Sequence, residues 1–459
     1  MAMIAPSINS DTISSSFKIN SAYIYPVCVV VALGGVLFGF DLVIISGTVP
    51  FFTSHFQLND LNQGWAVGCI NIGAALGALI AGKLSAAIGR KRTLLICAFL
   101  FALTGVATGW APNFTLFITA RLLSGVAVGV AALVCPVYIA EIAPASIRGR
   151  LVTLYQLAIV TGLLLAYLSN YLLLNTGQNN WRWMFSSQTV PALLFFAGLF
   201  FVPESPRWLI KKQRVGQAES ILNRIGGNNY VVAESASIQK SFSNEVKEKV
   251  SDLFKKDIWH IVLIGIAVAF FSQAGGQNSL FSYAPQIFKQ AGMAEDTAFM
   301  QSVIIGMVNF IFTFIAIVFI DRIGRRKLLL YGSILLMLDA LSLAYCFYVG
   351  ASGYFTLVFV LGFIAIYAAT LGPVTWVILS EIFPNRIRSS AMGLATLVLW
   401  IANFITTASF PVMKAQFGLH ITFAIHAGIC FIYFLFVKLR VPETKGKSLE
   451  EIEIQLTRK

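Results

Sequence analysis

Long apolar runs alternate with short polar connections along the whole of this chain. Each run has roughly 20 residues or more, the length that an α-helix needs to cross a hydrocarbon core of about 30 Å. The pattern predicts an all-α integral membrane protein with about twelve transmembrane helices. The predicted helices cover residues 24–50, 61–86, 93–111, 114–140, 150–173, 183–202, 257–289, 297–320, 328–349, 354–380, 390–412 and 418–438.

Composition agrees with a protein that lies in lipid. Of the 459 residues, 57% are hydrophobic and only 12% are charged, whereas about a quarter of the residues of a soluble domain are charged. We therefore expect the lipid bilayer to be the main solvent. The six cysteines all fall within predicted helices and show no paired spacing, so we expect neither a disulfide nor a metal site.

The basic residues, which give the chain a net charge of +13, gather in alternate connections between the helices. They do not follow one face with interleaved aromatic residues, so we expect no nucleic-acid partner. Connections rich in Lys and Arg face the cytoplasm. Both termini are therefore expected in the cytoplasm, and the protein is expected to be a multi-pass protein of the cell (plasma or inner) membrane. The clusters are Arg90 to Arg92, Arg148 with Arg150, Arg207 to Arg214, Arg322 to Lys327, and Arg386 with Arg388.

Three sequence motifs occur twice, at a constant offset of roughly 235 to 240 residues. Residues 89–92 recur at 324–327, residues 141–148 recur at 381–388, and the Pro-Glu pair at 203–204 recurs at 442–443. The chain is therefore expected to be a duplicated six-helix unit. The expected parts are a disordered cytoplasmic N-terminus (1–22), an N-terminal six-helix bundle (23–202), a cytoplasmic linker with short helices (203–256), a C-terminal six-helix bundle (257–438) and a cytoplasmic tail (439–459).

Duplicated six-helix halves are typical of transporters that bind a solute midway through the bilayer and expose it alternately to each side. The motifs of this chain are more specific than that. The chain contains GGVLFGFDLVIISG at 34–47, RLLSGVAVG at 121–129, PVYIAEIAPASIRGR at 136–150, PESPRWL at 203–209, DRIGRRK at 321–327, GPVTWVILSEIFPNRIR at 372–388 and VPETKGKSLEEIE at 441–453. On these motifs the sequence resembles the sugar porter family of the major facilitator superfamily over nearly its whole length.

The resemblance implies a transporter of monosaccharides or polyols, working by proton symport as in many microbes or by facilitated diffusion as in animals. We expect a proton-coupled importer whose functional unit is a monomer and which uses the proton gradient and no cofactor. The alternatives are a facilitative uniporter and a non-transporting sugar sensor. A sensor usually needs a long signalling tail, and only about 20 residues follow the last predicted helix. We find no cluster of nucleophile, acid–base or metal-binding residues, so we do not expect an enzyme.

Asp41 lies inside the first apolar run, where an ionised carboxylate costs at least ~2.5 kcal/mol. It should therefore face a wet cavity or a partner, and Arg121 in the fourth helix is the natural partner. The resemblance implies that Asp41 carries the proton and that Arg121 tunes it. A nearby guanidinium favours the carboxylate and burial favours the acid, so a change in their separation can load and release a proton. The alternative is a static structural ion pair.

A sugar needs side-chain amides for its hydroxyls and an aromatic platform for its ring. The resemblance implies sugar contacts from seven positions, and the amide of Gln277 adds an eighth position where the family usually has an apolar residue. The expected substrate-binding residues are Gln156, Gln273, Gln277, Asn278, Asn309, Trp376, Trp400 and Asn403. Any one of the amides can instead form only a hydrogen bond between helices.

The expected pocket is less polar than is usual in this family. Leu163, Ser272 and Leu399 stand where hexose porters usually have amides, and Ser282 replaces a gate tyrosine next to Tyr283. An unpaired buried hydroxyl costs about 1–3 kcal/mol. We therefore expect a substrate with fewer hydroxyl groups, such as a pentose or a deoxy sugar.

Charged residues near the cytoplasmic ends of the helices predict a latch whose partners pair across the two halves when the inside is shut. The alternative is that these arginines only fix topology and meet lipid phosphate. The expected latch residues are Arg90, Arg92, Glu141, Arg148, Glu204, Asp321, Arg325, Arg326, Glu381 and Arg388. Asp339 and His426 lie at similar depths in the membrane, and they could pair as a second titrating site.

Overall fold

The computed structural model describes residues 19–243, 253–351, 353–384, 387–446 and 451, with the side chains at 243, 256, 257, 321 and 389 left aside. The regular elements of this described part are α-helices, and it contains no strand. The expected all-α fold is confirmed. Residues 1–18 of the expected N-terminal tail, residues 244–252 of the linker, most of the C-terminal tail and the side chain of Asp321 lie outside the description.

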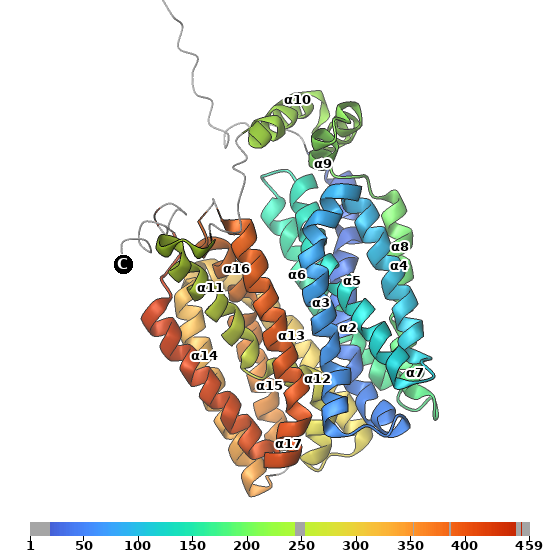
Figure 1. Ribbon diagram of the computed structural model, residues 1–459, viewed down its shortest axis with the longest axis vertical. Coiled ribbons are helices and arrows are strands. Elements are labelled where there is room, and N and C mark those ends of the chain that lie inside the picture. The colour runs from blue at the N-terminus through green and yellow to red at the C-terminus, as the bar shows by residue number, and fades with distance from the viewer. Residues whose placement is uncertain (1–18, 244–252, 352, 385–386, 447–450, 452–459) are drawn as a thin grey trace, which may run out of the picture.

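The helices of the first half pack into one bundle, coloured blue to green in Figure 1. Five of its membrane spans are single helices, and the sixth consists of two helices in succession. They are α2 (Ser21–His55), α3 (Asp60–Ile88), α4 (Arg90–Gly109), α5 (Phe114–Ile142), α6 (Arg148–Leu173), and α7 (Asn180–Ser187) with α8 (Thr189–Phe201).

The helices of the second half form the other bundle, coloured olive to red in Figure 1. Two of its spans are broken into two helices each. The helices are α11 (Lys256–Ala274) with α12 (Gln277–Gln290), α13 (Glu295–Ile323), α14 (Arg325–Val349), α15 (Gly353–Ala369) with α16 (Leu371–Ile382), and α17 (Arg388–Arg440).

The number of membrane spans depends on how α17 is counted. Eleven stretches of the described chain are long and apolar enough to cross a bilayer, and the last of them extends from Ser390 to Arg440. At Gly418 the backbone of α17 leaves the helical region, with φ at 75°. This helix of 53 residues therefore consists of two spans in succession. The chain has the twelve spans that its apolar runs predict.

Two helices lie outside the bundles, at one end of the molecule (Figure 1). They are α9 (Pro206–Lys211) and α10 (Val215–Ser243), and they share a small apolar core that includes Trp208, Leu209 and Ile238. The backbone amide of Asn20 donates a hydrogen bond to the carbonyl of Ile225 in α10, so α2 begins at this same end. We call this end the α10 end.

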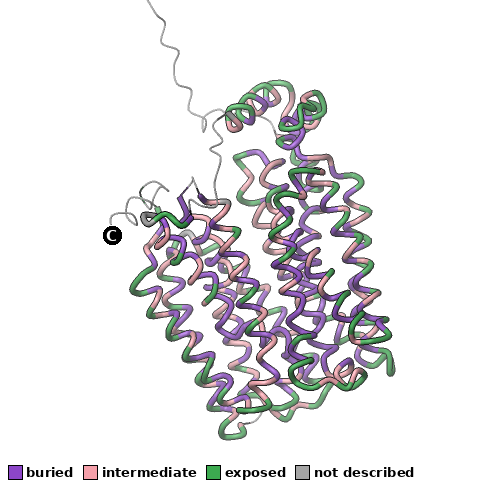
Figure 2. The backbone as a smooth tube through the Cα atoms, viewed as in Figure 1, coloured by how far each residue is buried: buried purple, intermediate pink, exposed green. Residues whose placement is uncertain are grey.

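The interior of each bundle is buried as in a soluble protein, but the outer surface is apolar where a soluble protein would be polar. Figure 2 shows buried residues in the interior of each bundle and exposed residues along the outer faces. Many of the exposed residues are large and apolar, among them Leu79, Phe99, Phe201, Ile311 and Leu338. Apolar helix faces of this extent need lipid around them, and the chain is a multi-pass membrane protein.

Candidate functional site

A cavity of about 130 Å³ lies between the two bundles. Its wall is built by both halves, from α2, α3 and α6 on one side and from α11, α12, α13, α15, α16 and α17 on the other. Seven of the eight expected substrate-binding residues line it. These are Gln156, Gln273, Asn278, Asn309, Trp376, Trp400 and Asn403.

The helical repeat of α17 explains how several of these side chains reach the cavity. Trp400, Asn403 and Thr407 follow one another at spacings of three and four residues, which places them on one face of the helix. All three line the cavity. The ring of Trp400 packs on that of Phe38 from the other half, with centroids 5.7 Å apart. The site therefore joins the two halves of the molecule.

Two helix breaks bring backbone and amides together at the cavity. Between α11 and α12 the chain turns at Gly276, whose φ of 99° is favourable only for glycine. Gln273 and Asn278 lie on either side of this break, and the amide of Asn278 donates to Gln273 Oε1 over 2.7 Å. The second break is at Thr370, between α15 and α16. It lies just before Gly372 and Pro373, and proline lacks the backbone N–H that a helix interior needs.

Gln277 is the one expected sugar contact that does not line the cavity. Its side-chain amide donates to the carbonyl oxygen of Ser272 over 2.7 Å and so bridges the break between α11 and α12. The left-handed turn at Gly276 changes the register between the two helices. For this reason Asn278, and not its neighbour Gln277, points to the cavity.

Several polar atoms of the cavity wall are buried without a hydrogen-bond partner. They are Nε1 of Trp400, Oδ1 of Asn403 and Oδ1 of Asn71. A buried polar atom left unpaired costs about 1–3 kcal/mol. A ligand that brings hydroxyl groups into the cavity can pair with these atoms, because a hydroxyl both donates and accepts.

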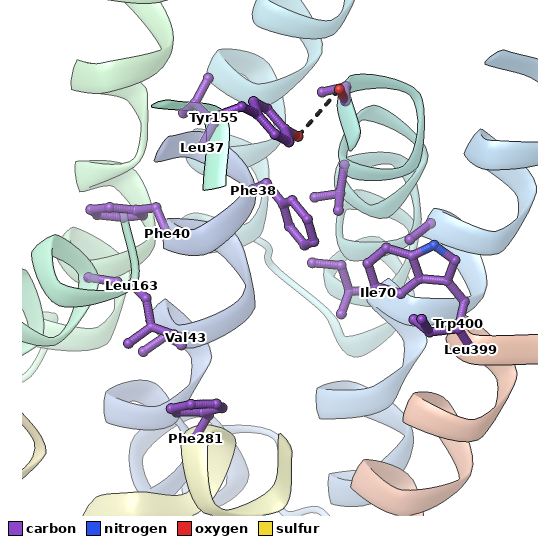
Figure 3. Close-up of a cluster of buried hydrophobic side chains, with 14 of the residues drawn as sticks. Leu37, Phe38, Phe40, Val43, Ile70, Tyr155, Leu163, Phe281, Leu399 and Trp400 are labelled. Atoms are coloured by element: carbon purple, nitrogen blue, oxygen red, sulfur yellow. Dashed lines mark hydrogen bonds between the residues drawn. The ribbon is translucent and has the colours of Figure 1, made fainter. Parts of the chain in front are cut away.

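Part of the cavity wall is apolar, since Phe38, Val43, Ile70, Leu163 and Leu399 line it; Figure 3 shows these side chains. Leu163 and Leu399 are two of the positions where the sequence departs from the polar pattern of related porters. Ser282, which stands in place of a gate tyrosine, also lines the cavity. The neighbouring Tyr283 is fully buried, and its hydroxyl donates to the carbonyl of Thr407 over 3.0 Å.

Some lining residues were not expected from the sequence. Asn71 of α3 lines the cavity and its amide donates to Thr407 Oγ1 in the other half over 3.3 Å. Tyr367 of α15 and Thr313 of α13 line it as well. Asn71 is an amide at bilayer depth like those that the sequence singled out, so the same signal was available for it.

Asp41 and Arg121 are buried together inside the first bundle, away from the cavity wall. Arg121 Nη1 lies 2.5 Å from Asp41 Oδ1, and the hydroxyl of Ser124 donates to the other carboxylate oxygen. The guanidinium also lies over the ring of Phe185, 5.7 Å from its centroid. Phe38, one turn before Asp41 on α2, lines the cavity. A shift of α2 therefore moves the acid and the cavity wall together.

The two ends of the interface between the halves differ. At the end away from α10, α3 packs tightly on α17, where a Cβ at Gly64 would overlap the carbonyl oxygen of Ala408. The hydroxyl of Tyr167 in α6 donates to the carbonyl of Phe281 in α12 over 2.8 Å. Toward the α10 end, a second cavity of about 410 Å³ shares Phe38, Gln156 and Trp376 with the first. The space between the halves thus extends from the site toward the α10 end.

The charged motif of the first half forms a closed set of contacts. Arg90 binds both carboxylate oxygens of Glu141, over 2.7 and 2.9 Å. Glu204 accepts hydrogen bonds from the backbone amides of Arg90 and Lys91 at the start of α4. The hydroxyl of Ser205 donates to Glu141 over 2.6 Å.

The second half repeats this arrangement with the equivalent residues. Arg325 lies 3.0 Å from Glu381, Glu443 accepts from the backbone amide of Arg325 over 3.0 Å, and the hydroxyl of Thr444 donates to Glu381 over 2.6 Å. The two ion pairs, Arg90–Glu141 and Arg325–Glu381, each join residues of the same half.

The remaining expected latch residues make other contacts in this conformation. Arg148 and Arg388 donate to the carbonyls of Ala143 and Phe383, each over 3.3 Å, and Arg326 donates to the carbonyl of Lys438 over 2.8 Å. Arg92 is exposed.

Asp339 and His426 do not pair, contrary to one interpretation of the sequence. Asp339 of α14 lies against Gly362 of α15, and its Oδ2 is buried without a partner. His426 of α17 lies against the break between α11 and α12, with Nδ1 3.3 Å from the carbonyl oxygen of Ala274. The two side chains thus contact different helices, and their similar depth in the membrane stays a prediction.

Comparison with known proteins gives consistent matches over nearly the whole chain. The model of the family described as "Sugar (and other) transporter" matches residues 27–456. The chain is 39% identical to the arabinose-proton symporter of Bacillus subtilis over 92% of both chains. It is 36% identical to the D-xylose-proton symporter of Escherichia coli, over 95% of this chain and 96% of that one.

A similar match is found among solved structures. The inward-open conformation of the xylose transporter XylE from E. coli superposes with a TM-score of 0.85, at 35% identity, over 94% of this chain and 100% of that one. The same transporter bound to 6-bromo-6-deoxy-D-glucose gives a TM-score of 0.79, at 35% identity, over 95% and 100% of the two chains.

Proposed function

The chain belongs to the sugar (and other) transporter family, within the major facilitator superfamily, and from this premise we propose that it imports a monosaccharide, a pentose or a hexose, by proton symport. The relatives named above are sugar–proton symporters, which favours a small sugar and a proton as the two transported species. The protein is a transporter and not an enzyme, and its energy source is the proton gradient and no cofactor.

The observation that carries this proposal is the set of unpaired polar atoms in the cavity between the halves. Trp400 Nε1, Asn403 Oδ1 and Asn71 Oδ1 belong to residues that line the same cavity as one further tryptophan and four further amides. A sugar matches this wall, because its hydroxyls pair with the amides and its ring face packs on an indole. The proposed sugar contacts are Gln156, Gln273, Asn278, Asn309, Trp376, Trp400 and Asn403, with Asn71 added.

The direction of access follows from the two ends of the interface. We assign the α10 end, which carries the basic clusters, to the cytoplasm. Both termini are then cytoplasmic, in a monomer that spans the cell membrane, surrounded by lipid. The packing of α3 on α17 closes the outer side and the second cavity leads inward, so the conformation is inward-facing. The TM-score of 0.85 with the inward-open relative supports this assignment.

The proposed organisation is that of two rocking bundles, residues 23–202 and 257–438. Residues 203–256 link them on the cytoplasmic side, and residues 1–22 and 439–459 form the cytoplasmic tails. Alternating access then consists of the exchange of contacts between the bundles around a fixed site.

Asp41 is the proposed proton carrier, and Arg121 is the group that tunes it. A carboxylate held only by one guanidinium and one hydroxyl keeps its charge while those contacts last. When α2 moves, the loss of the guanidinium favours proton uptake, since burial then favours the neutral acid. A uniporter is the nearest alternative, and it would leave this buried ion pair as a structural link.

The charged motifs at the cytoplasmic end are proposed to act as the latch of the inward-closed state. In the present conformation their ion pairs stay within each half. Closing the cytoplasmic side brings the two sets together, and the carboxylates then exchange partners between the halves. The Glu204 and Glu443 side chains fix the starts of α4 and α14 on which the arginines stand.

The substrate is proposed to carry fewer hydroxyl groups than the usual hexose substrates of the family. Leu163 and Leu399 make part of the cavity wall apolar, and a hydroxyl facing them would lose about 1–3 kcal/mol of hydrogen bonding. This favours a pentose or a deoxy sugar. A screen of pentoses, hexoses and polyols for thermal stabilisation of the purified protein identifies the substrate.

The decisive test is uptake into proteoliposomes with a sugar found in that screen. Symport predicts that sugar entry alkalinises the outside medium and that an imposed proton gradient accumulates sugar above its outside concentration. Sugar uptake with no proton movement supports the uniporter. A protein that neither binds nor passes any carbohydrate contradicts both.

A further inference from the structure

His426 is a buried histidine in the last membrane span, and the transport mechanism described so far does not use it. Only 4% of its surface is exposed. Nδ1 lies 3.3 Å from the carbonyl oxygen of Ala274, and Nε2 is buried with no hydrogen-bond partner among the residues that the structure describes. A carbonyl oxygen only accepts, so Nδ1 is the donor, and the lone pair of the neutral ring is on Nε2.

The carbonyl that His426 binds lies at the C-terminal end of a helix. Ala274 is the last residue of α11, where the helix leaves its final carbonyls without partners in the same helix. The next carbonyl, that of Gly275, faces the sulfur of Cys430, which is one turn from His426 on α17. The last span thus supplies donors to the end of α11 from two successive turns.

The break at Gly276 joins α11 to α12, and we call α12 the lid of the cavity and this break its hinge. Beyond Gly276, α12 lies between the cavity and the outer face, and Asn278, Phe281 and Ser282 line the cavity from it. The lid is fastened to the first half by the hydrogen bond from Tyr167 to the carbonyl of Phe281. Opening the outer side must break that bond, and the chain can turn most easily at Gly276, which has no Cβ.

His426 also occupies the space beside the hinge. A Cβ at Gly276 would lie 2.8 Å from the imidazole ring, so the ring packs directly on the turn. Burying the unpaired Nε2 costs stability that an apolar side chain of similar size would not cost. Packing alone therefore does not explain a histidine here, whereas a donor aimed at the hinge does.

We propose that His426 is a positioning residue for sugar binding: its hydrogen bond to Ala274 holds the end of α11 fixed while the lid α12 moves. Gln273 directly precedes Ala274, and Asn278 lies two residues after Gly276. A fixed hinge keeps these two amides pre-organised for the sugar, which lowers the entropy cost of binding. The inference rests on the proposed transport function, and it adds that the hydrogen bond of His426 contributes to the affinity for the sugar.

Two substitutions separate the hydrogen bond from the packing. His426→Phe keeps an aromatic ring beside Gly276 and removes the donor. His426→Asn loses the ring but keeps an N–H at the same distance along the side chain as Nδ1. We expect His426→Phe to raise the KM for sugar uptake by about two- to tenfold, with the maximal rate within about twofold of wild type. His426→Asn should keep KM within about twofold of wild type.

The proposal is overturned if KM of His426→Phe stays at the wild-type value, or if His426→Asn raises KM as much as His426→Phe does. A purely structural role would instead lower the amount and thermal stability of both variants without this difference between them. If His426→Phe is made in too small an amount, His426→Leu with His426→Asn gives the same comparison.

A second measurement tests the hinge without any sugar. Ser282→Cys places a thiol on the lid at the cavity wall, and the six native cysteines are all buried. Labelling of this thiol from the outside by a membrane-impermeant maleimide should be faster by about two- to tenfold when His426→Phe is added, and unchanged when His426→Asn is added. Equal labelling rates contradict the proposed hinge. If the wild type carries no sugar, the proposed function fails while this test of the hinge remains valid.

Discussion

Asp41 and Arg121 form an ion pair that is buried inside a single bundle and not at the interface between the bundles. Nη1 lies 2.5 Å from Oδ1, and each side chain is about 1% exposed. The two nitrogens of Arg121 that do not face Asp41, Nε and Nη2, have no hydrogen-bond partner. A guanidinium left partly unsatisfied is held less firmly than one with all five N–H groups paired. The pair is thus suited to separating and re-forming.

Asp41→Asn should uncouple sugar movement from the proton gradient. The amide keeps the shape of the side chain but carries no titratable proton, so the free energy of the gradient no longer drives the sugar. We expect counterflow exchange to remain, and the accumulation ratio in energised vesicles to fall to about one. Both are measured with radiolabelled sugar in the same proteoliposome preparation.

The matched control is Asp339→Asn, which makes the same change at an acid near the middle of another membrane span, α14. Asp339 lies on α14 against Gly362, in neither the cavity wall nor the ion pair. Accumulation should persist in this variant. If Asp41→Asn still concentrates sugar, or if Asp339→Asn abolishes accumulation equally, Asp41 is not the specific coupling residue.

Trp400→Phe should weaken sugar binding while transport continues. Phenylalanine keeps an aromatic face toward the cavity and removes Nε1, which has no hydrogen-bond partner within the described part of the chain. If a sugar hydroxyl accepts from this nitrogen, the affinity falls by about two- to tenfold. The change in affinity is measured by isothermal titration calorimetry, or by a thermal-shift assay that does not depend on tryptophan fluorescence. Trp183→Phe, at an exposed tryptophan outside the cavity, is the control, and an equal loss of affinity there argues against the contact.

The sequence predicts the spans of this fold well because lipid imposes a simple rule. Every span must be apolar over about 20 residues and must satisfy its own backbone. The prediction for residues 328–349, for example, differs from the observed Arg325–Val349 by three residues at one end only. The basic residues at that end carry charge to the surface, so hydropathy alone places the helix start too late.

The rotation of each helix about its own axis is harder to predict. Asn71 reaches the cavity because α3 packs against Thr407, a residue 336 positions later in the chain. Gln277 turns away because the left-handed turn at Gly276 resets the helix face, and a continuous helical period does not show such a turn. The predicted pairing of Asp339 with His426 used only their similar depth in the membrane. Depth does not determine the direction in which a side chain leaves its helix. Contacts between distant residues decide the cases of Asn71 and of Asp339 with His426, and a single sequence does not contain them.

Leu163→Gln should widen the range of sugars that the cavity accepts. Leu163 lines the apolar side of the cavity, and the amide adds a donor and an acceptor there. A sugar with one more hydroxyl facing this wall gains about 0.5–1.5 kcal/mol, which is about a two- to tenfold change in affinity. The ratio of KM for a hexose to KM for the matching pentose is the measurement, and we expect it to fall. An unchanged ratio means that Leu163 does not contact the part of the sugar where the two differ.

Gly64→Trp should hold the cavity open to the outside. Gly64 of α3 faces the backbone of Ala408 in α17, where even a Cβ would overlap the carbonyl oxygen. Overpacking of this kind costs about 1–3 kcal/mol, so the population of the state that is closed on the outside falls by roughly 5- to 100-fold. Sugar binding from the outside remains, because the cavity itself is unchanged, while net uptake falls by a similar factor.

Gly82→Trp is the control for this experiment, since it lies on the same helix and no heavy atom would lie within 4 Å of its Cβ. Uptake by this variant should stay near the wild-type rate. External labelling of Ser282→Cys reports the state of the outer side directly, and it should rise with Gly64→Trp and stay constant with Gly82→Trp. If Gly64→Trp takes up sugar at the wild-type rate, the contact between α3 and α17 does not close the outer path, and the assignment of this conformation as inward-facing loses its main structural support.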